Sequence, residues 1–442
     1  MLYQISENVK KEVLKYCEEY EIYIEQVEAL KLESQKSDLN FAKEELSFGI
    51  GIRVLNNEKI GFAYTSDIEQ IKNTAKQAFL NTKINEKDEN FGFAEKEKEK
   101  TIKGTFDSKN KDLNIDESIE FLKEMIAFVE EEKCEVSSGN FSKTCKESLI
   151  INSNDIAISD KGTWFGSSIS INAEKNGEKS SAYDYLSSRS FDLESKKMVK
   201  NVCKIAKDSI NGEFIETKNR EVVFDYHAAS GLLSTFINAF SADNIQRGRS
   251  ILKDKKDQLI IDKNITITND STLNKGLLSS KCDGEGVVSK KTKLVEDGTL
   301  KSYIYDVYTS KKEGEESTAN GYRESYNNIP QISPSNIIFD FKEEKGIDEI
   351  NDGFIVTDVL GAHTANPISG DFSVEANNAF LIENGEITKP VKKAMISGNL
   401  FEILNDCKKL KSETKQYGPF IIPKIIINNL KVLGWWNGMW KL

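Results

Sequence analysis

The stretch FGIGIRVLNNEKIGFAYTSD, residues 48–67, contains two runs of alternating apolar and polar residues separated by the turn-forming residues NNEK. Alternation at every second residue is typical of a half-buried strand, and a short polar turn between two such runs predicts a β-hairpin. The residues that follow, DIEQIKNTAKQAFLNT, carry apolar side chains at helical spacing and predict an amphipathic helix. A hairpin followed by a helix favours an antiparallel sheet with helices packed on it, which is an α+β fold.

The remainder of the first half continues this pattern. Residues 1–35 predict a helix that passes into a strand, and residues 115–132 predict a strong amphipathic helix. Residues 85–112 are charged and poor in large apolar groups, which predicts a long connection. Residues 148–193 predict a meander of short strands with turns at Asn-Asp, Lys-Gly and Asn-Gly.

The second half is rich in predicted strands. The clearest hairpin turns are at Asp297-Gly298 and Asn384-Gly385, and GNLFEILNDCKKLKSE near the end predicts a helix. We therefore expect two α+β domains, residues 1–216 and residues 217–442, with mostly antiparallel sheets flanked by helices.

The charge balance bears on the partners of the protein. There are 71 acidic and 60 basic residues, a net charge of −11, and an acidic surface repels phosphate backbones. No apolar run approaches the length of a membrane span, and the first residues lack the basic-then-apolar order of a signal peptide. We expect a cytoplasmic protein that binds neither nucleic acid nor membrane.

Candidate chemistry is sparse. The chain has two histidines, His227 and His363, and no nucleotide-binding loop, nucleophile elbow or HExxH motif. One interpretation is a stand-alone metal-dependent hydrolase that uses both histidines with a carboxylate or Cys282. The turn CDGEGVVSKK offers Asp283 and Glu285 either as cation ligands or as caps of backbone amides, and a tight structural turn is the favoured interpretation.

Several motifs occur in a recognisable order along the chain. They are GIGIRVLNNEKIGFAYTSD, RGRS, CDGEGV, LVEDGTLKSYIYDVYTS, STANGYR, ISGDFSVEANNAFLIENGEITKPV and ISGNLFEIL. Together they resemble the TldD/PmbA family. The resemblance implies a cytoplasmic two-subunit zinc metalloprotease that also carries an older label as a modulator of DNA gyrase. In that family the TldD-type subunit carries an HExxxH zinc motif, and the PmbA-type subunit, also called TldE, lacks it.

The stretch GLLSTFINAFSAD, residues 231–243, shows which type the chain resembles. Its apolar residues form one helical stripe that predicts core packing. Alignment with the family places Ser234, Thr235 and Ala239 where the motif has histidine, glutamate and histidine. A hydroxyl or a methyl group does not replace an imidazole as a zinc ligand, and no general base remains at Thr235. The resemblance therefore implies a non-catalytic PmbA/TldE-type chain.

The resemblance also implies partners and a binding site. Zinc is expected in a TldD-like catalytic partner and not in this chain. The shared cavity is expected to hold an unfolded peptide, with Asp283, Glu285, His363 and Asp371 as its predicted lining residues. A non-enzymatic binding or regulatory homodimer is the remaining alternative.

Overall fold

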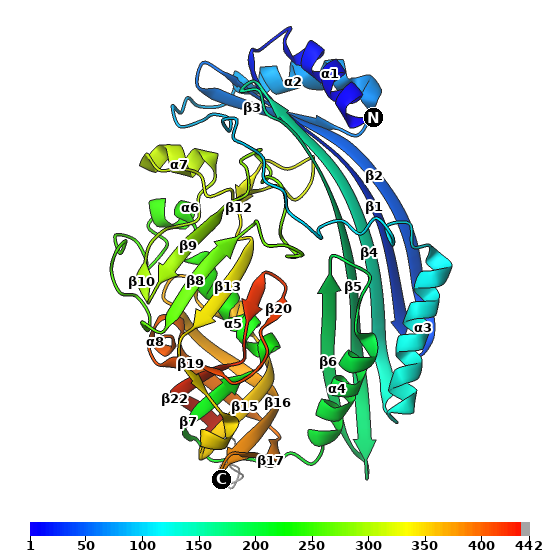
Figure 1. Ribbon diagram of the computed structural model, residues 1–442, viewed down its shortest axis with the longest axis vertical. Helices are drawn as coiled ribbons and strands as arrows, with labels where there is room; N and C mark the ends of the chain where they lie inside the picture. The colour runs from blue at the N-terminus through cyan, green and yellow to red at the C-terminus, as the bar shows by residue number, and fades with distance from the viewer. Residues whose placement is uncertain (435–442) are drawn as a thin grey trace, which may run out of the picture.

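The computed structural model describes residues 1–434, and its first part is a long curved sheet (Figure 1). Six antiparallel strands follow one another in the order β3-β2-β1-β4-β5-β6. Their bounds are β1 (Glu19–Gln35), β2 (Asp38–Asn56), β3 (Lys59–Thr65), β4 (Glu135–Asn152), β5 (Ala157–Lys175) and β6 (Glu178–Ser188). Four of these strands have 17 to 19 residues, so the sheet forms an arch beside the rest of the molecule.

The hairpin predicted over residues 48–67 is confirmed. Strands β2 and β3 pair with Asn56 opposite Lys59, which leaves a two-residue turn of Asn57 and Glu58. Both turn residues have positive φ, 52° and 61°. A type I′ turn requires this backbone geometry, because its twist matches the twist of the two flanking strands.

Four helices cover one face of the arch at its two ends (Figure 1). Helices α1 (Leu2–Val13) and α2 (Ile71–Thr82), the latter preceded by the 3₁₀ turn η1 (Ile68–Gln70), enclose a core around Ile22 and Ile52. Helices α3 (Ile115–Glu131) and α4 (Ser195–Asp208) enclose a second core around Phe165. The predicted helix over residues 115–132 is confirmed, and it begins with a capping box between Asn114 and Glu117.

The predicted meander of short strands over residues 148–193 is wrong in part. The Asn154-Asp155 and Asn176-Gly177 segments are turns, but β5 runs straight through Lys161 and Gly162. These two residues pair with Glu147 and Lys146 in the middle of the ladder between β4 and β5. The Lys-Gly pair therefore does not mark a turn, since pairing with β4 holds it extended.

The second part of the chain contains two larger sheets. One has the order β10-β9-β8-β13-β21-β20, and in the other the strands β7, β15, β16, β18 and β22 pair in a ring that closes on itself. Most pairs are antiparallel, and three are parallel: β13 with β21, β14 with β19, and β15 with β7. The strand bounds are β7 (Lys218–Phe224), β8 (Ile265–Asp270), β9 (Lys291–Glu296), β10 (Thr299–Leu300), β11 (Gly321–Tyr322), β12 (Gln331–Ile332), β13 (Asn336–Phe341), β14 (Glu344–Lys345), β15 (Asp352–Leu360), β16 (Asp371–Glu383), β17 (Glu386–Val391), β18 (Ala394–Asn399), β19 (Cys407–Leu410), β20 (Lys415–Tyr417), β21 (Phe420–Ile422) and β22 (Ile425–Gly434).

Helix α5 (Tyr226–Asn238) lies in the core of this second part. Its side chains Leu232, Phe236 and Ile237 are at most 2 % exposed, so the apolar stripe packs as the sequence predicts. The other helical segments are short: α6 (Ala242–Gln246), α7 (Val307–Glu313), α8 (Leu400–Ile403), η2 (Ile347–Glu349) and η3 (Ala362–Thr364). The fold is therefore α+β with mostly antiparallel sheets.

The long helix predicted from GNLFEILNDCKKLKSE is wrong. Helix α8 has four residues, and the chain then forms β19, in which Cys407 pairs with Ile427 of β22. Cys407 is fully buried, so strand pairing with a distant segment overrides the local helical pattern. Within residues 1–434, no helix is long and apolar enough to cross a membrane.

Candidate functional site

The motifs FGIGIR, CDGEGV and STANGYR, far apart in the sequence, meet where the arch contacts the second part of the chain. Arg53 of β2 donates to both carboxylate oxygens of Glu21 on β1, at 2.8 and 2.5 Å. It also reaches Glu285 Oε1 at 3.3 and 3.4 Å. Arg323 donates to Glu21 from the other side. We call the set Glu21, Arg53, Asp283, Glu285 and Arg323 the junction.

The junction carries more acid than base. All five side chains belong to the buried or partly buried interior, and three carboxyl groups face two guanidinium groups. Burial raises the pKa of Asp283 to about 7, although three backbone amides donate to it. Burial likewise raises the pKa of Glu285 to about 8 against the attraction of Arg53. The turn thus caps amides and joins the two parts of the molecule.

Glycines in the same motifs allow this close approach. A Cβ at Gly49 would lie 2.3 Å from the ring of Tyr326, and one at Gly51 would lie 2.4 Å from the Tyr326 carbonyl oxygen. A Cβ at Gly321 would lie 2.5 Å from the Glu285 carboxylate. Real side chains do not tolerate such distances, so these glycines fit the junction by lacking a Cβ.

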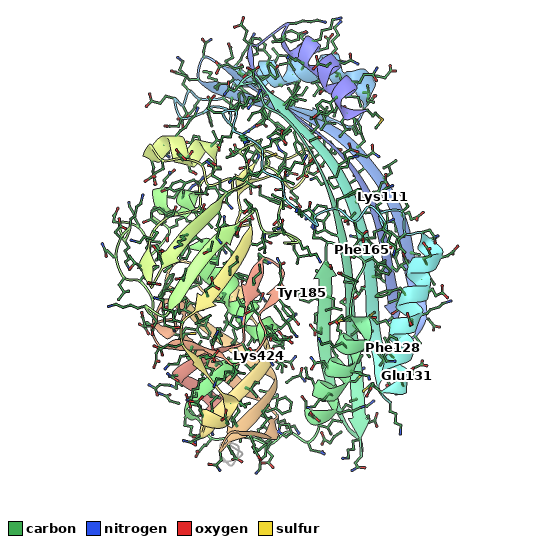
Figure 2. The ribbon with its side chains drawn as sticks, viewed as in Figure 1. Lys111, Phe128, Glu131, Phe165, Tyr185 and Lys424 are labelled. Atoms are coloured by element: carbon green, nitrogen blue, oxygen red, sulfur yellow. The ribbon has the colours of Figure 1, made fainter. Side chains whose placement is uncertain are left out.

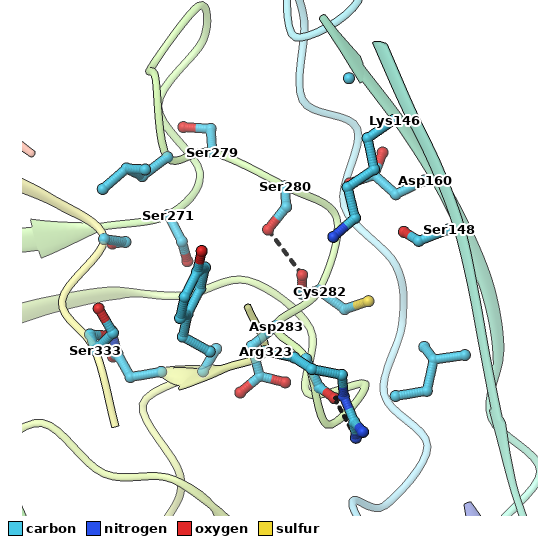
Figure 3. A pocket seen from close by; sticks show the side chains of 18 of the residues that line it. Lys146, Ser148, Asp160, Ser271, Ser279, Ser280, Cys282, Asp283, Arg323 and Ser333 are labelled. Carbon is cyan, nitrogen blue, oxygen red and sulfur yellow. Dashed lines mark hydrogen bonds between the residues drawn. The ribbon is translucent and has the colours of Figure 1, made fainter. Parts of the chain in front are cut away.

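A cavity of about 440 Å³ opens beside the junction, between the inner face of the arch and loops of the second part (Figure 3). Lys146 and Ser148 project into it from β4, and Asp160 projects from β5. Cys282 and Asp283 line the opposite wall. We call this cavity the inter-sheet pocket. Its position between two sheets, its size and its mixed apolar and polar walls are typical of a ligand site.

The residues aligned with the zinc motif lie on and just after helix α5. Ser234 is exposed and donates its hydroxyl to the Gly231 carbonyl oxygen at 2.7 Å. Thr235 is 9 % exposed, and Ala239 is 2 % exposed in the core. A zinc ion takes imidazole, thiolate and carboxylate ligands. The hydroxyl groups of Ser234 and Thr235 and the methyl group of Ala239 therefore do not form a zinc site.

His227 is the second residue of α5, and its side chain packs against strands β6 and β20. Its Nδ1 is 3.2 Å from Asp358 Oδ1, and its ring contacts Tyr183, Tyr185 and Tyr417 edge-on. Burial alone would lower the pKa of His227, but the hydrogen bond and charge of Asp358 raise it above its usual value. Figure 2 labels Tyr185 of β6, where the arch faces the second part of the chain, and Lys424 within that second part.

The other predicted site residues lie apart from the junction. His363 is exposed in η3, and Asp371 is exposed at the start of β16, where Asn399 and Ser369 donate to it and lower its pKa. Of the predicted lining residues, Asp283 lines the inter-sheet pocket, and Glu285 lies in the junction. In the part of the chain that the structure describes, no three His, Cys, Asp or Glu side chains form a metal-binding group. The structure therefore does not assemble His227, His363 and a third ligand.

Sequence reasoning missed the cationic and aromatic residues of the inter-sheet pocket, Lys146, Trp164 and Arg189. A signal for Lys146 and Trp164 was present, because residues 146, 148 and 150 of β4 and residues 158, 160, 162 and 164 of β5 line the pocket at a spacing of two. The prediction of a turn at Lys161-Gly162 hid this periodicity.

Comparisons with known proteins cover nearly the whole chain. Three family models match in order: PmbA/TldA metallopeptidase domain 1 over residues 20–82, the central domain over residues 108–210, and the C-terminal domain over residues 217–434. An uncharacterized protein of Methanocaldococcus jannaschii is 38 % identical over 86 % of this chain and 88 % of its own length. Metalloprotease PmbA of Escherichia coli O157:H7 is 25 % identical over 87 % of this chain and 85 % of its own.

Solved structures agree with these matches. The crystal structure of TldE from Thermococcus kodakarensis superposes with a TM-score of 0.91 at 25 % identity, covering 97 % of this chain and all of that one. The similarity therefore extends over the arch and the second part together.

Proposed function

The chain belongs to the PmbA/TldD metallopeptidase family, and on that premise we propose that it is the PmbA/TldE-type subunit of a zinc metalloprotease complex and is itself non-catalytic. A TldD-like partner would supply the zinc ion and the general base. This chain would complete a shared cavity that binds unfolded peptide for proteolysis, in the cytoplasm. We also propose that residues 1–216 and 217–442 are separate domains.

One observation carries the proposal. The helix positions aligned with HExxxH hold Ser234, Thr235 and Ala239, of which the last two are buried. Metal-assisted peptide hydrolysis needs an ion to polarise the carbonyl group and a base to activate water. Neither role is available to a hydroxyl that donates to its own helix or to a methyl group. The similarity to TldE supports the same assignment.

The arrangement of strands supports the peptide-binding role. Strand β6 pairs with β5 on one side only, and β20 ends the neighbouring sheet. Tyr185 of β6 and Tyr417 of β20 contact each other where the two parts meet, with ring centroids 5.5 Å apart. A free strand edge binds an extended peptide through backbone hydrogen bonds and so tolerates many sequences.

Reconstitution tests this function. The chain and a TldD-like subunit are purified separately and mixed, and cleavage of an unfolded peptide is measured with and without a chelator. We expect cleavage by the mixture that the chelator abolishes, and none by this chain alone. Chelator-sensitive cleavage by the chain alone would refute the proposal and favour a stand-alone hydrolase that uses His227 or His363.

The homodimer alternative has a separate outcome. If the chain forms a stable homodimer that neither binds the TldD-like subunit nor changes its cleavage rate, a non-enzymatic binding or regulatory protein is the better account.

A further inference from the structure

Lys146 and Arg189 are two cations that line the inter-sheet pocket. In the ladder between β4 and β5, Lys146 lies directly opposite Gly162, so both face the pocket. A Cβ at Gly162 would lie 2.6 Å from Arg189 Nη2 and 2.6 Å from the Trp164 ring. The absent side chain thus leaves room for the Arg189 guanidinium next to Gly162.

Arg189 is a buried cation that makes no hydrogen bond to a carboxylate among residues 1–434, although the charge of Asp160 on the pocket floor attracts it. It is 3 % exposed, and its guanidinium lies 3.9 Å from the centre of the Trp164 ring. Four of its five N–H groups donate to neutral carbonyl oxygens, of Thr105, Leu277 and Ser279. Nη2, the atom above Gly162, donates only once and so keeps one N–H group for a ligand. Buried charges are normally paired, and an unpaired one at a cavity wall calls for an anion.

The other charges near this position are largely engaged. Lys146 pairs with Glu25 at 2.7 Å, and Lys161 pairs with Glu147 at 3.2 Å. Asp160, the carboxylate on the pocket floor, accepts the backbone amides of Lys161 and Lys281. Asp283 on the opposite wall accepts three backbone amides. Arg189 therefore remains the charged group of the pocket without an opposite charge in hydrogen-bonding contact.

Part of the remaining wall is apolar, and serines line much of the rest. Ile150 and Ile158 lie opposite each other on β4 and β5, and Leu277, Leu278 and Pro334 face them from the loops. A cavity of about 440 Å³ is large enough for an amino-acid residue together with its neighbour. The pocket thus combines a cationic position at Arg189 with an apolar surface on one side.

We infer that the inter-sheet pocket binds a carboxylate joined to an apolar group, with Arg189 and Lys146 as its cationic contacts and Trp164 and the isoleucines beside the apolar part. Resting on the proposed peptide-binding function, the inference assigns this carboxylate to the free C-terminus of the peptide. An acidic side chain offers the same chemistry and is the second source to be distinguished.

The test compares three labelled hexapeptides on the full-length chain by fluorescence anisotropy. The first ends in leucine with a free carboxylate, the second is its C-terminal amide, and the third is an amide whose last residue is glutamate. We expect the free acid to bind about 10- to 100-fold more tightly than the leucine amide, since a charge-assisted contact contributes about 1.5–3 kcal/mol. Tight binding of the glutamate amide alone would support the carboxylate site but assign it to acidic side chains.

Two variants, each of which replaces one cationic side chain of the pocket by glutamine, test where the carboxylate binds. Arg189→Gln is expected to remove the preference for the acid, and Lys161→Gln, at the exposed rim, is expected to keep it. Circular dichroism and melting temperature show whether Arg189→Gln is folded. If it is not, the ratio of the affinities for the leucine acid and the leucine amide, measured on the unmodified chain, still tests the inference.

Two outcomes overturn the inference and separate it from the proposed function. Equal binding of all three peptides would refute the carboxylate site while leaving peptide binding intact. No binding of any peptide would refute the site and would also count against a peptide-binding role for this subunit, which the reconstituted cleavage assay would then decide.

Discussion

Replacing Arg53 by methionine is expected to lower the free energy of unfolding by about 3–5 kcal/mol, because the change breaks a buried ion pair and leaves its partners unpaired. The Arg53 side chain is 7 % exposed, and that of Glu21 is 0 % exposed. Methionine keeps much of the volume but removes two contacts to Glu21 and two to Glu285. Arg323 then remains as the guanidinium in contact with Glu21, and Glu285 loses its own.

Urea unfolding followed by far-ultraviolet circular dichroism measures this loss at pH 7. Arg247→Met is the matched control, because Arg247 is 59 % exposed in an ion pair with Asp243. Its unfolding midpoint is expected to stay close to that of the unmodified chain, since exposed pairs contribute little. Arg53→Lys is expected to fall between the two, because it keeps the charge and loses the two-pronged contact.

The stability loss expected for Arg53→Met can be refuted directly. If Arg53→Met unfolds within about 1 kcal/mol of the unmodified chain, the junction contributes no more than a surface ion pair. Other contacts, such as that between Arg323 and Glu21, would then hold the two parts together.

Three further predictions follow from named contacts. Asp283 and Glu285 have folded pKa values of about 7 and about 8, above the ordinary 3.8 and 4.5, so the folded state holds protons that the unfolded state has released. The free energy of unfolding should therefore fall as pH rises from about 4 through about 8 and should level off above pH 8. Melting temperatures measured against pH on the His227→Gln chain test this without a contribution from the histidine. If adding Asp283→Asn left the dependence of melting temperature on pH unchanged, the prediction would be contradicted. Gly49→Ala should cost about 1–3 kcal/mol, because its Cβ would overlap the Tyr326 ring, and an unchanged melting temperature would refute the close contact. Gly231→Ala should instead stabilise helix α5 by about 0.5–1 kcal/mol, since its Cβ would lie 3.5 Å from Ala362, an ordinary contact; a lower melting temperature would be the opposite result.

The local pattern of apolar and polar residues correctly predicted the helices and strands that are stabilised by residues close to them in sequence. The 48–67 hairpin depends on a two-residue turn, and the helix over residues 115–131 depends on its own apolar stripe and capping box, so both could be predicted. The strand at Cys407 and the continuous strand through Gly162 depend on pairing with other segments, which local patterns do not contain. Each was predicted as something else for that reason.

The junction and the pocket follow the same rule. Arg53 and Glu285 are 232 residues apart, and Glu21 and Arg323 are 302 apart, so no spacing in the sequence connects them. The sequence singled out the turn with Asp283 and Glu285 and offered capping of amides as one interpretation, and the structure places both carboxylates on backbone amides. The contacts of this turn with the arch arise only when the chain folds, so the sequence pattern does not contain them.

Zinc stoichiometry tests the central claim most directly. The chain is mixed with a TldD-like subunit in zinc-containing buffer, and native mass spectrometry counts the metal ions in the complex. The account predicts one zinc ion for each pair of subunits, which disappears when both histidines of the partner's HExxxH motif are replaced by alanine. A zinc ion that stays with this chain after that replacement would contradict the account.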